Sequence, residues 1–179
     1  MAAIQQVPTT MVSDKKKAIL EELMLEARDK ASLEPEVGGV KGEVVTRCII
    51  FNRDKNRVPL EILYEHNWSG NPVPSYPPFI FNEMHPAQFK HQGTLPQGSK
   101  GGFVYADRKS FPARKWLVAF DIPKNKVYVE AGPIGPVDWN VVEVKLNASE
   151  NSSYHEDPVF GGVAEAGIYN GQLNGAFTN

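Results

Sequence analysis

Residues 60–68 read Leu60-Glu61-Ile62-Leu63-Tyr64-Glu65-His66-Asn67-Trp68, and they form the sharpest strand pattern in this chain of 179 residues. Successive side chains of a strand point to opposite faces of a sheet. The pattern therefore predicts one face with large apolar and aromatic side chains: Leu60, Ile62, Tyr64, His66 and Trp68. An antiparallel sheet with one face packed on a core is typical of such a strand.

Short strand-like runs, bounded by Pro, Gly, Asn or Asp, flank this segment along the chain. They predict strands at 43–52, 79–81, 87–92, 101–106, 115–121, 126–131 and 140–146. In the last of these strands we expect Val142, Val144 and Leu146 to face inward. The fold class that follows is mainly β, a single-domain antiparallel β-sandwich.

Turn chemistry predicts how the strands connect. The polar loop 52–57, followed by Pro59 at the entry to the next strand, is expected to join the first two strands as a hairpin, and residues 122–125 have the length of a second hairpin. The pair Asn170-Gly171 predicts a third, at about 165–178, which either closes the sheet or forms a loose extension. Residues 147–155 are rich in Asn, Ser and Glu, so we expect a mobile loop there.

The amino-terminal part of the chain has a different pattern. Residues 1–12 are expected to be flexible and residues 13–179 to form one domain. Apolar side chains recur at helical spacing from about residue 14 to residue 31, which predicts a helix that docks on the β domain.

Composition narrows the class of partner and the compartment. Nineteen basic and 21 acidic residues give a net charge of −2 without a long block of one sign, so we expect no nucleic-acid partner. The single cysteine, Cys48, lies in a strand-like run and is interpreted as a buried structural thiol. The first residues lack a secretory pattern, so the expected location is cytoplasmic.

The candidate binding residues are Tyr64, His66, Trp68 and Tyr76, which bring aromatic and polar groups to the Pro-rich stretch 69–78. We expect them to recognise a carbohydrate, a small metabolite or a protein. Trp68 and Tyr76 flank the turn and are expected to be exposed. Alternation, by contrast, predicts that Phe79 and Phe81 belong to the core.

Signals for catalysis, metal ions and cofactors are weak. The four histidines are spread out without the paired spacing of a zinc site, so no metal and no cofactor are expected. No nucleophile elbow or dinucleotide fingerprint occurs, and we assign no catalytic residues. The segment Gly98-Ser99-Lys100-Gly101-Gly102 is interpreted as a hairpin turn and not a phosphate loop. The enzyme alternative is acid–base chemistry on a plant metabolite by Tyr64, His66 and a carboxylate such as Glu130.

The order of several motifs resembles the small jasmonate-induced proteins of plants, the 23 kDa class, over about residues 12–146. The motifs are Cys48-Ile49-Ile50-Phe51-Asn52, 60–70, 76–78, 88–93, Gly98-Ser99, 103–105, 115–120 and 125–130. The resemblance implies a cytoplasmic, stress- or defence-associated plant protein and brings no catalytic residues with it.

A fainter likeness is to the aegerolysins and actinoporins, which are β-sandwiches that bind membrane lipids. It rests on the Gly-Ser turn before a Gly-Phe strand and on a Trp-containing strand that ends in Asp121-Ile122-Pro123. This likeness implies a sandwich, and it makes membrane-lipid binding the alternative function.

Overall fold

The computed structural model describes residues 42–53, 58–109 and 112–178, together with Ala18, Glu21, Glu22 and Leu25, which are helical. The rest of the helix expected at 14–31, its docking and the expected flexible segment 1–12 lie outside the described residues. No helix in the described part of the chain is long and apolar enough to cross a membrane.

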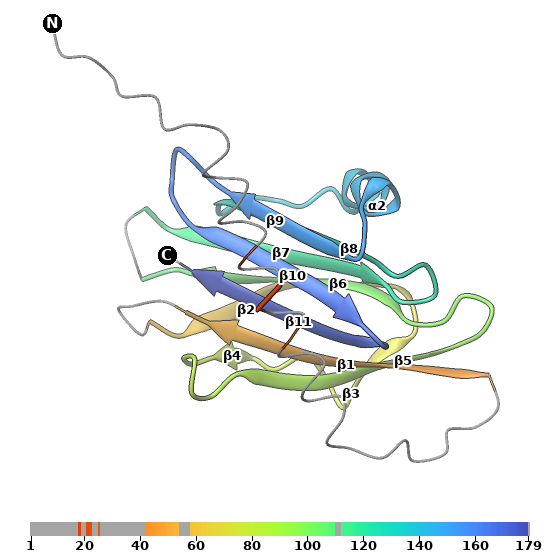
Figure 1. The fold of residues 1–179 in the computed structure, drawn as a ribbon. Helices are drawn as coiled ribbons and strands as arrows, with labels where there is room; N and C mark the ends of the chain where they lie inside the picture. Colours follow the sequence, from red (N-terminus) through yellow and green to blue (C-terminus); the bar gives the residue numbers. More distant parts are fainter. Residues whose placement is uncertain are drawn as a thin grey trace, which may run out of the picture.

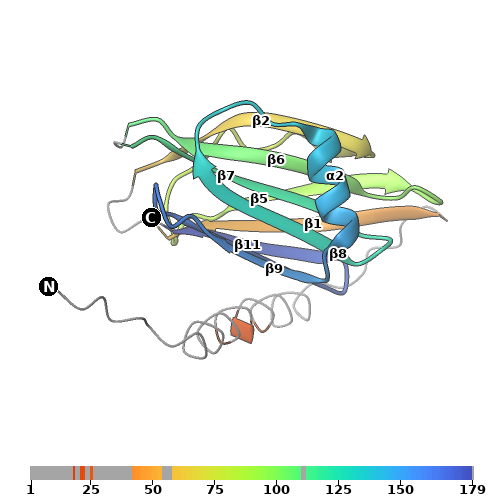
Figure 2. The ribbon, with the colours of Figure 1, turned by 90° about the horizontal axis from the view of Figure 1, so that it is seen from above.

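Two stacked sheets form the fold, as Figures 1 and 2 show. The first sheet has six strands in the order β3 (Asn71–Val73), β5 (Ala87–Thr94), β1 (Glu43–Asn52), β11 (Gln172–Thr178), β10 (Val163–Tyr169) and β9 (Ser152–Glu156). The second sheet has five, in the order β4 (Phe79–Ile80), β2 (Leu60–Ser69), β6 (Lys100–Asp107), β7 (Arg114–Asp121) and β8 (Lys126–Pro133). The predicted mainly β sandwich is confirmed.

Neighbouring strands are antiparallel except β1 and β11, which are parallel. The main core fills the space between the sheets, where alternate residues of β7, Trp116, Val118 and Phe120, are fully buried. The other face of β7 carries Leu117 and Ala119, which pack under the helix α2 (Trp139–Ala148). A strand that is apolar on both faces is thus covered on both sides.

The helix α2 corrects the strand predicted at 140–146. Asp138 caps its amino terminus by accepting hydrogen bonds from the backbone N–H groups of Asn140 (3.0 Å) and Val141 (3.3 Å). Val142 and Leu146, four residues apart, share the buried helix face, whereas Val144 is 69% exposed. The spacing 142, 146 fits a helix as well as a strand, and the cap together with the apolar outer face of the second sheet favours the helix.

Leu146→Ala and Val144→Ala distinguish the two assignments. We expect Leu146→Ala to lower the free energy of unfolding by about 2–5 kcal/mol, because it empties a fully buried site. Val144→Ala should change it by less than about 0.5 kcal/mol, because the side chain is exposed. Urea denaturation measures both values, and equal losses would mean that residues 142–146 alternate as a strand does.

Two of the three predicted hairpins are confirmed. β7 and β8 pair across 122–125, and β10 and β11 pair across Asn170-Gly171, where both residues have positive φ, as a tight hairpin turn requires. The hairpin predicted between the first two strands is wrong, because β1 and β2 belong to different sheets. Both edges of β1 are occupied, by β5 and by the tail strand β11.

Residues 152–156 form the strand β9, so the loop predicted at 147–155 is only partly correct. β9 pairs with β10 in the first sheet. Its Ser153 Oγ and His155 Nδ1 also accept hydrogen bonds from the backbone N–H groups of Val129 (3.2 Å) and Ala131 (3.0 Å) at the edge of β8. These side chains accept hydrogen bonds from backbone N–H groups that would be unpaired at the edge of β8, and they connect the two sheets.

A β-bulge corrects the predicted faces of β2. Ile62 lies opposite Tyr105 and Tyr64 lies opposite Val104, so Leu63 is an extra residue in the strand. Leu60 and Ile62 therefore face the main core, whereas Tyr64, His66 and Trp68 face outward, toward the side of the sheet that carries α2. Strict alternation cannot reveal such an insertion.

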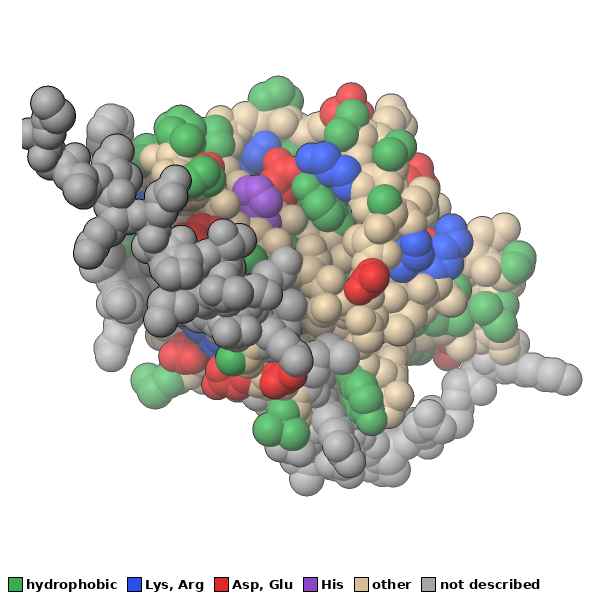
Figure 3. Space-filling view, turned by 45° about the horizontal axis from the view of Figure 1, so that its top comes forward, with side chains coloured by type: hydrophobic (Ala, Val, Ile, Leu, Met, Phe, Trp, Pro, Cys, Tyr) green, Lys and Arg blue, Asp and Glu red, His purple; other side chains and the backbone are tan. Residues whose placement is uncertain are grey.

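The surface turned to the viewer in Figure 3 carries acidic and basic side chains intermixed, with hydrophobic side chains scattered among them and at its borders. The two ends of the sandwich are built from loops. The end where β2 finishes contains a cavity lined by described residues.

Candidate functional site

The cavity begins where the chain passes from one sheet to the other. After β2, Gly70 turns the backbone with φ +82°, and Asn71 of β3 then pairs with Gln92 of β5 in the first sheet. A Cβ atom on Gly70 would lie 2.4 Å from the backbone oxygen of Gln92. Only glycine allows both this backbone conformation and this close approach.

A second close approach forms the other wall. Between β5 and β6 the chain makes a tight turn in which Gly98 N–H donates to the Thr94 carbonyl at 2.8 Å. A Cβ atom on Gly93 would lie 1.9 Å from the carbonyl oxygen of Gly98. Ser69 Oγ donates to that same oxygen at 2.7 Å, which fastens the turn to the end of β2. The turn predicted at Gly98 is present, although it connects strands of different sheets and not a paired hairpin.

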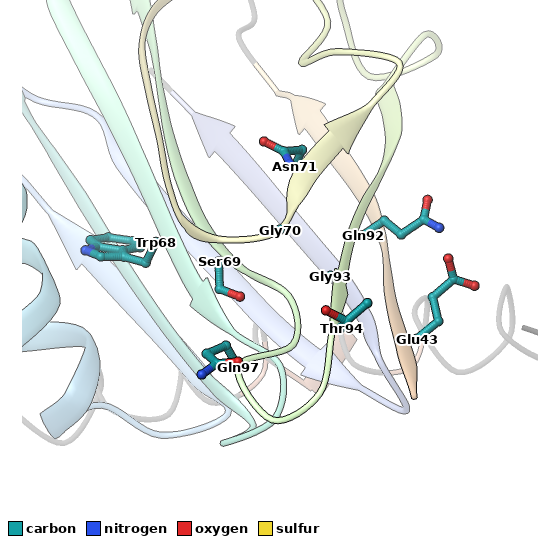
Figure 4. A pocket seen from close by; sticks show the side chains of 9 residues that line it. All are labelled: Glu43, Trp68, Ser69, Gly70, Asn71, Gln92, Gly93, Thr94 and Gln97. Atoms are coloured by element: carbon teal, nitrogen blue, oxygen red, sulfur yellow. The ribbon is translucent and has the colours of Figure 1, made fainter. Parts of the chain in front are cut away.

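Between these walls lies a pocket of about 410 Å³, shown in Figure 4. Trp68 bounds it on the side nearest α2, and Glu43 and Gln92 lie on the far side. The lining residues are Glu43, Trp68, Ser69, Gly70, Asn71, Gln92, Gly93, Thr94 and Gln97. Amide and hydroxyl groups both donate and accept hydrogen bonds, so this lining suits a ligand that is itself rich in hydroxyl groups.

An aromatic cluster holds Trp68 in place on the outer face of the second sheet. The His66 ring lies 4.7 Å from that of Trp68, edge to face, and stacks on the Trp139 ring of α2 at 5.1 Å with an interplanar angle of 13°. Gly102 makes room for this cluster, because a Cβ atom there would lie 2.8 Å from Trp139 Cζ3. The rings of Trp139 and His66 therefore connect α2 to Trp68 at the border of the pocket.

Lys100 links the same aromatic cluster to α2 through charge interactions. Its Nζ atom lies 5.3 Å from the centre of the Trp68 ring, and it pairs with Glu143 of α2. Asp121 Oδ2 is 3.8 Å from the same nitrogen and also 3.5 Å from Lys124 Nζ. The charges next to Trp68 are thus balanced among themselves.

The structure separates the four predicted binding residues. Trp68 lines the pocket, His66 lies in the ring cluster, and Tyr64 is on the same face of β2 and 38% exposed. Tyr76 was predicted to be exposed and is buried in the main core, where its hydroxyl donates to Asn67 Oδ1 at 2.8 Å. That tyrosine therefore lies on the other side of the sheet from the remaining three. Their role in ligand binding stays a prediction.

The prediction that Phe79 and Phe81 are core residues is wrong. They are 43% and 54% exposed, and their rings lie 6.0 Å apart at the end of the sandwich where β2 begins. Ile80 between them is fully buried. Alternation was present, as predicted, but the choice of the inward face was reversed.

A buried polar network lies under the end of β2. Tyr76 and His91 Nε2 (3.0 Å) both bond to Asn67 Oδ1, and His91 Nδ1 lies 2.9 Å from Ser99 Oγ, which in turn bonds to Thr46. Because Asn67 Oδ1 is an acceptor, Nε2 carries a hydrogen. Burial lowers the pKa of His91 from 6.5 to about 4, which favours the neutral imidazole.

This network predicts loss of stability in mild acid. The unfolded chain protonates His91 below about pH 6.5, whereas the folded chain resists protonation down to a pKa of about 4. The contribution of neutral His91 to the free energy of unfolding is therefore fully present above about pH 6.5, and roughly 2–3 kcal/mol of it is lost as the pH drops toward 4. Urea midpoints measured from pH 7 to 4 should fall less steeply for His91→Gln than for the wild type.

His85→Gln, at an exposed position, is the matched control and should keep the wild-type pH dependence. If His91→Gln loses stability with pH as steeply as the wild type, the buried imidazole is not the acid-sensitive group.

The chemistry available to these groups is limited by access. Ser99, His91 and Asn67 form a hydrogen-bonded series, but Ser99 and His91 are fully buried and offer no route to a substrate. The acid–base pair imagined for His66 and Glu130 is not assembled. Glu130 lies on β8, which is separated from β2 by the two strands β6 and β7, and it bonds to Tyr128 and Lys145. Within the described ranges, no three His, Cys, Asp or Glu side chains group so as to hold a metal ion.

Sequence reasoning missed most of the pocket lining and the second tryptophan of the cluster. Asn71, Gln92, Thr94 and Gln97 each stand in a turn or next to a glycine, where polar residues are usual. Their shared signal is the glycine that accompanies each group, Gly70, Gly93 and Gly98, since two of these have positive φ and all three meet close neighbours. Trp139 was missed because α2 was predicted to be a strand.

Comparisons with known proteins support the fold and the resemblance. No protein-family model matches the chain. The chain is 27% identical over 131 residues to a jasmonate-induced protein homolog from Atriplex canescens. The aligned region covers 66% of this chain and 70% of that protein. The predicted resemblance to jasmonate-induced proteins is confirmed at this level of similarity.

Solved structures with a similar fold include the lipid binding protein Nakanori, with a TM-score of 0.61 at 17% identity, over 97% of this chain and 89% of Nakanori. A variant of the lectin from Xerocomus chrysenteron has a TM-score of 0.51 at 10% identity, over 79% of this chain and 99% of the lectin. At such low identity these likenesses bear on the fold alone.

Proposed function

We propose that this protein is a non-enzymatic binding protein of plant stress responses, which takes a small hydroxyl-rich ligand, a saccharide, in the pocket at the end of β2. The observation that carries the proposal is the pocket itself. Residues with amide and hydroxyl side chains from three segments line it, together with a tryptophan.

The chemistry of the lining supports a saccharide over an apolar metabolite. Asn71, Gln92 and Gln97 each offer an acceptor oxygen and a donor NH₂ group, the combination that neighbouring sugar hydroxyls require. Trp68 adds an apolar wall against which the C–H groups of a sugar ring can pack. The volume of about 410 Å³ lies within the usual range for small-molecule sites. The fold neighbour from Xerocomus chrysenteron is itself named a lectin.

A glycan and metabolite array, followed by calorimetry on the best saccharide, tests this proposal. Gln92→Ala should weaken binding about 10-fold or more, because it removes a donor and an acceptor from the pocket. Gln88→Ala is the matched control, since it changes the same residue type on the same strand at an exposed position outside the lining. Equal affinity of the two variants would remove the pocket as the binding site.

Membrane-lipid binding is the second candidate, and a different surface favours it. Phe79, Phe81 and Met84 are exposed at the end of the sandwich opposite the pocket, where β4 pairs with the start of β2. Exposed apolar side chains on loops at one end suit insertion into a lipid surface. Nakanori, the other fold neighbour, is named a lipid binding protein.

Co-sedimentation with vesicles of plant lipids tests the second candidate. The wild type should pellet and Phe81→Ser should stay in the supernatant, whereas the pocket variant Gln92→Ala should pellet like the wild type. If the wild type stays in the supernatant with every lipid mixture, this candidate fails.

A further inference from the structure

We infer that the pocket selects a saccharide carrying a protonated amine, an amino sugar, through the carboxylate of Glu43. The inference rests on the proposed function and names its ligand class more closely. Of the nine residues that line the pocket, Glu43 is the single charged one.

The charge of Glu43 is not balanced within the described structure. It stands at the first position of β1, opposite Thr94, and its side chain is partly buried at the far side of the pocket from Trp68. None of the ion pairs among the described residues includes it. A partly buried carboxylate that has no cation partner among the described residues attracts a positively charged group on a ligand.

The cation next to Trp68 already has acidic partners. Lys100 packs over the Trp68 ring and pairs with Glu143, with Asp121 also close to its ammonium group. The pocket therefore presents a negative charge to the ligand, next to amide and hydroxyl groups. A neutral sugar can form hydrogen bonds with the amide groups but no ion pair, and an acidic sugar is repelled by Glu43. An amino sugar can form both the hydrogen bonds and an ion pair with Glu43.

The amine can come from a free sugar or from the end of a polymer, and the two sources are separated by the choice of probe. Calorimetry at pH 6, where a sugar amine is protonated, compares glucosamine, a glucosamine oligomer, N-acetylglucosamine, glucose and glucuronate. We expect glucosamine or its oligomer to bind about 10-fold more tightly than N-acetylglucosamine, with glucuronate the weakest. An advantage of the oligomer over glucosamine identifies a polymer as the source, and equal affinity identifies the free sugar.

Glu43→Gln keeps the shape of the side chain and removes its charge. This variant should bind glucosamine and N-acetylglucosamine equally, while its affinity for N-acetylglucosamine stays at the wild-type value. Glu61→Gln is the matched control, because it removes the same charge from an exposed position near the opposite end of β2. Raising the salt concentration should shrink the preference of the wild type, which tests its electrostatic origin without any variant.

The outcomes separate the two claims. If neutral sugars bind and glucosamine has no advantage, or if Glu43→Gln keeps the advantage, the inference is overturned and the saccharide pocket stands. If no saccharide of any charge binds, the proposed function fails and this inference fails with it.

Discussion

Replacing Phe120 with alanine is expected to lower the free energy of unfolding by about 3–5 kcal/mol, a large part of the stability of a domain. Phe120 is fully buried between the two sheets. Its ring meets that of His91 edge to face at 5.1 Å and lies against Gly101. Truncation would leave a cavity beside the buried polar network, so the loss includes packing on both an apolar and a polar neighbour.

Lys124→Ala, four residues along the chain, is the control. Its side chain is exposed and contributes one ion pair with Asp121, which keeps its contact with Lys100. We expect a change of less than about 0.5 kcal/mol. Guanidinium denaturation midpoints compare the two variants, and similar midpoints would mean that the space between the sheets is not the core.

Gly93→Ala is expected to cost about 1–3 kcal/mol or more, because the added methyl group has no room. The Cβ atom would lie 1.9 Å from the backbone oxygen of Gly98, and a backbone atom cannot move aside as a flexible side chain can. The tight turn between β5 and β6 would have to open, and with it the wall of the pocket that Thr94 and Gln97 form.

Gly135→Ala is the matched control for this substitution, because no atom lies within 4 Å of the position of its Cβ. It should change stability by less than about 0.5 kcal/mol and leave ligand binding unchanged. Thermal unfolding and saccharide calorimetry on both variants give the comparison. A Gly93→Ala protein with wild-type stability and affinity would show that the turn does not form the pocket wall as described.

The strands were predictable because their signal is local. The run 43–52 became β1 with the same bounds, and turn residues marked the hairpins at 122–125 and Asn170-Gly171. The pairing of the strands was harder to predict from the sequence, because it depends on segments that are far apart in the chain. The place beside β1 is taken by β11, more than 100 residues later, and not by β2.

The helix α2 could not be predicted from local sequence propensity. Val141, Val142 and Val144 have strand propensity, yet the outer face of β6 and β7 offers Val104, Leu117 and Ala119 as a surface that a helix can cover. Asp138 completes the first turn as a cap. Tertiary packing thus outweighed propensity over ten residues.

The site was predictable only in part, for a related reason. Trp68 was identified from its position before the Pro-rich stretch, and it lines the pocket. Tyr76 was assigned to the same site but packs on Phe89 at 5.1 Å in the core, since the chain changes sheets at Gly70 between the two residues. Apart from Ser69 and Gly70, the remaining lining comes from β1, β3, β5 and the following turn, and single-sequence patterns do not show that these meet.

Chemical-shift mapping of the ¹⁵N-labelled protein, titrated with the saccharide that binds best on the array, locates the ligand without any substitution. We predict that the largest shifts occur at the backbone amides of Gly70, Asn71, Gly93 and Thr94, which surround the pocket, with little change at Phe79, Phe81 and Met84. Largest shifts at that opposite end, or no shifts with any saccharide, would contradict a saccharide pocket at the end of β2.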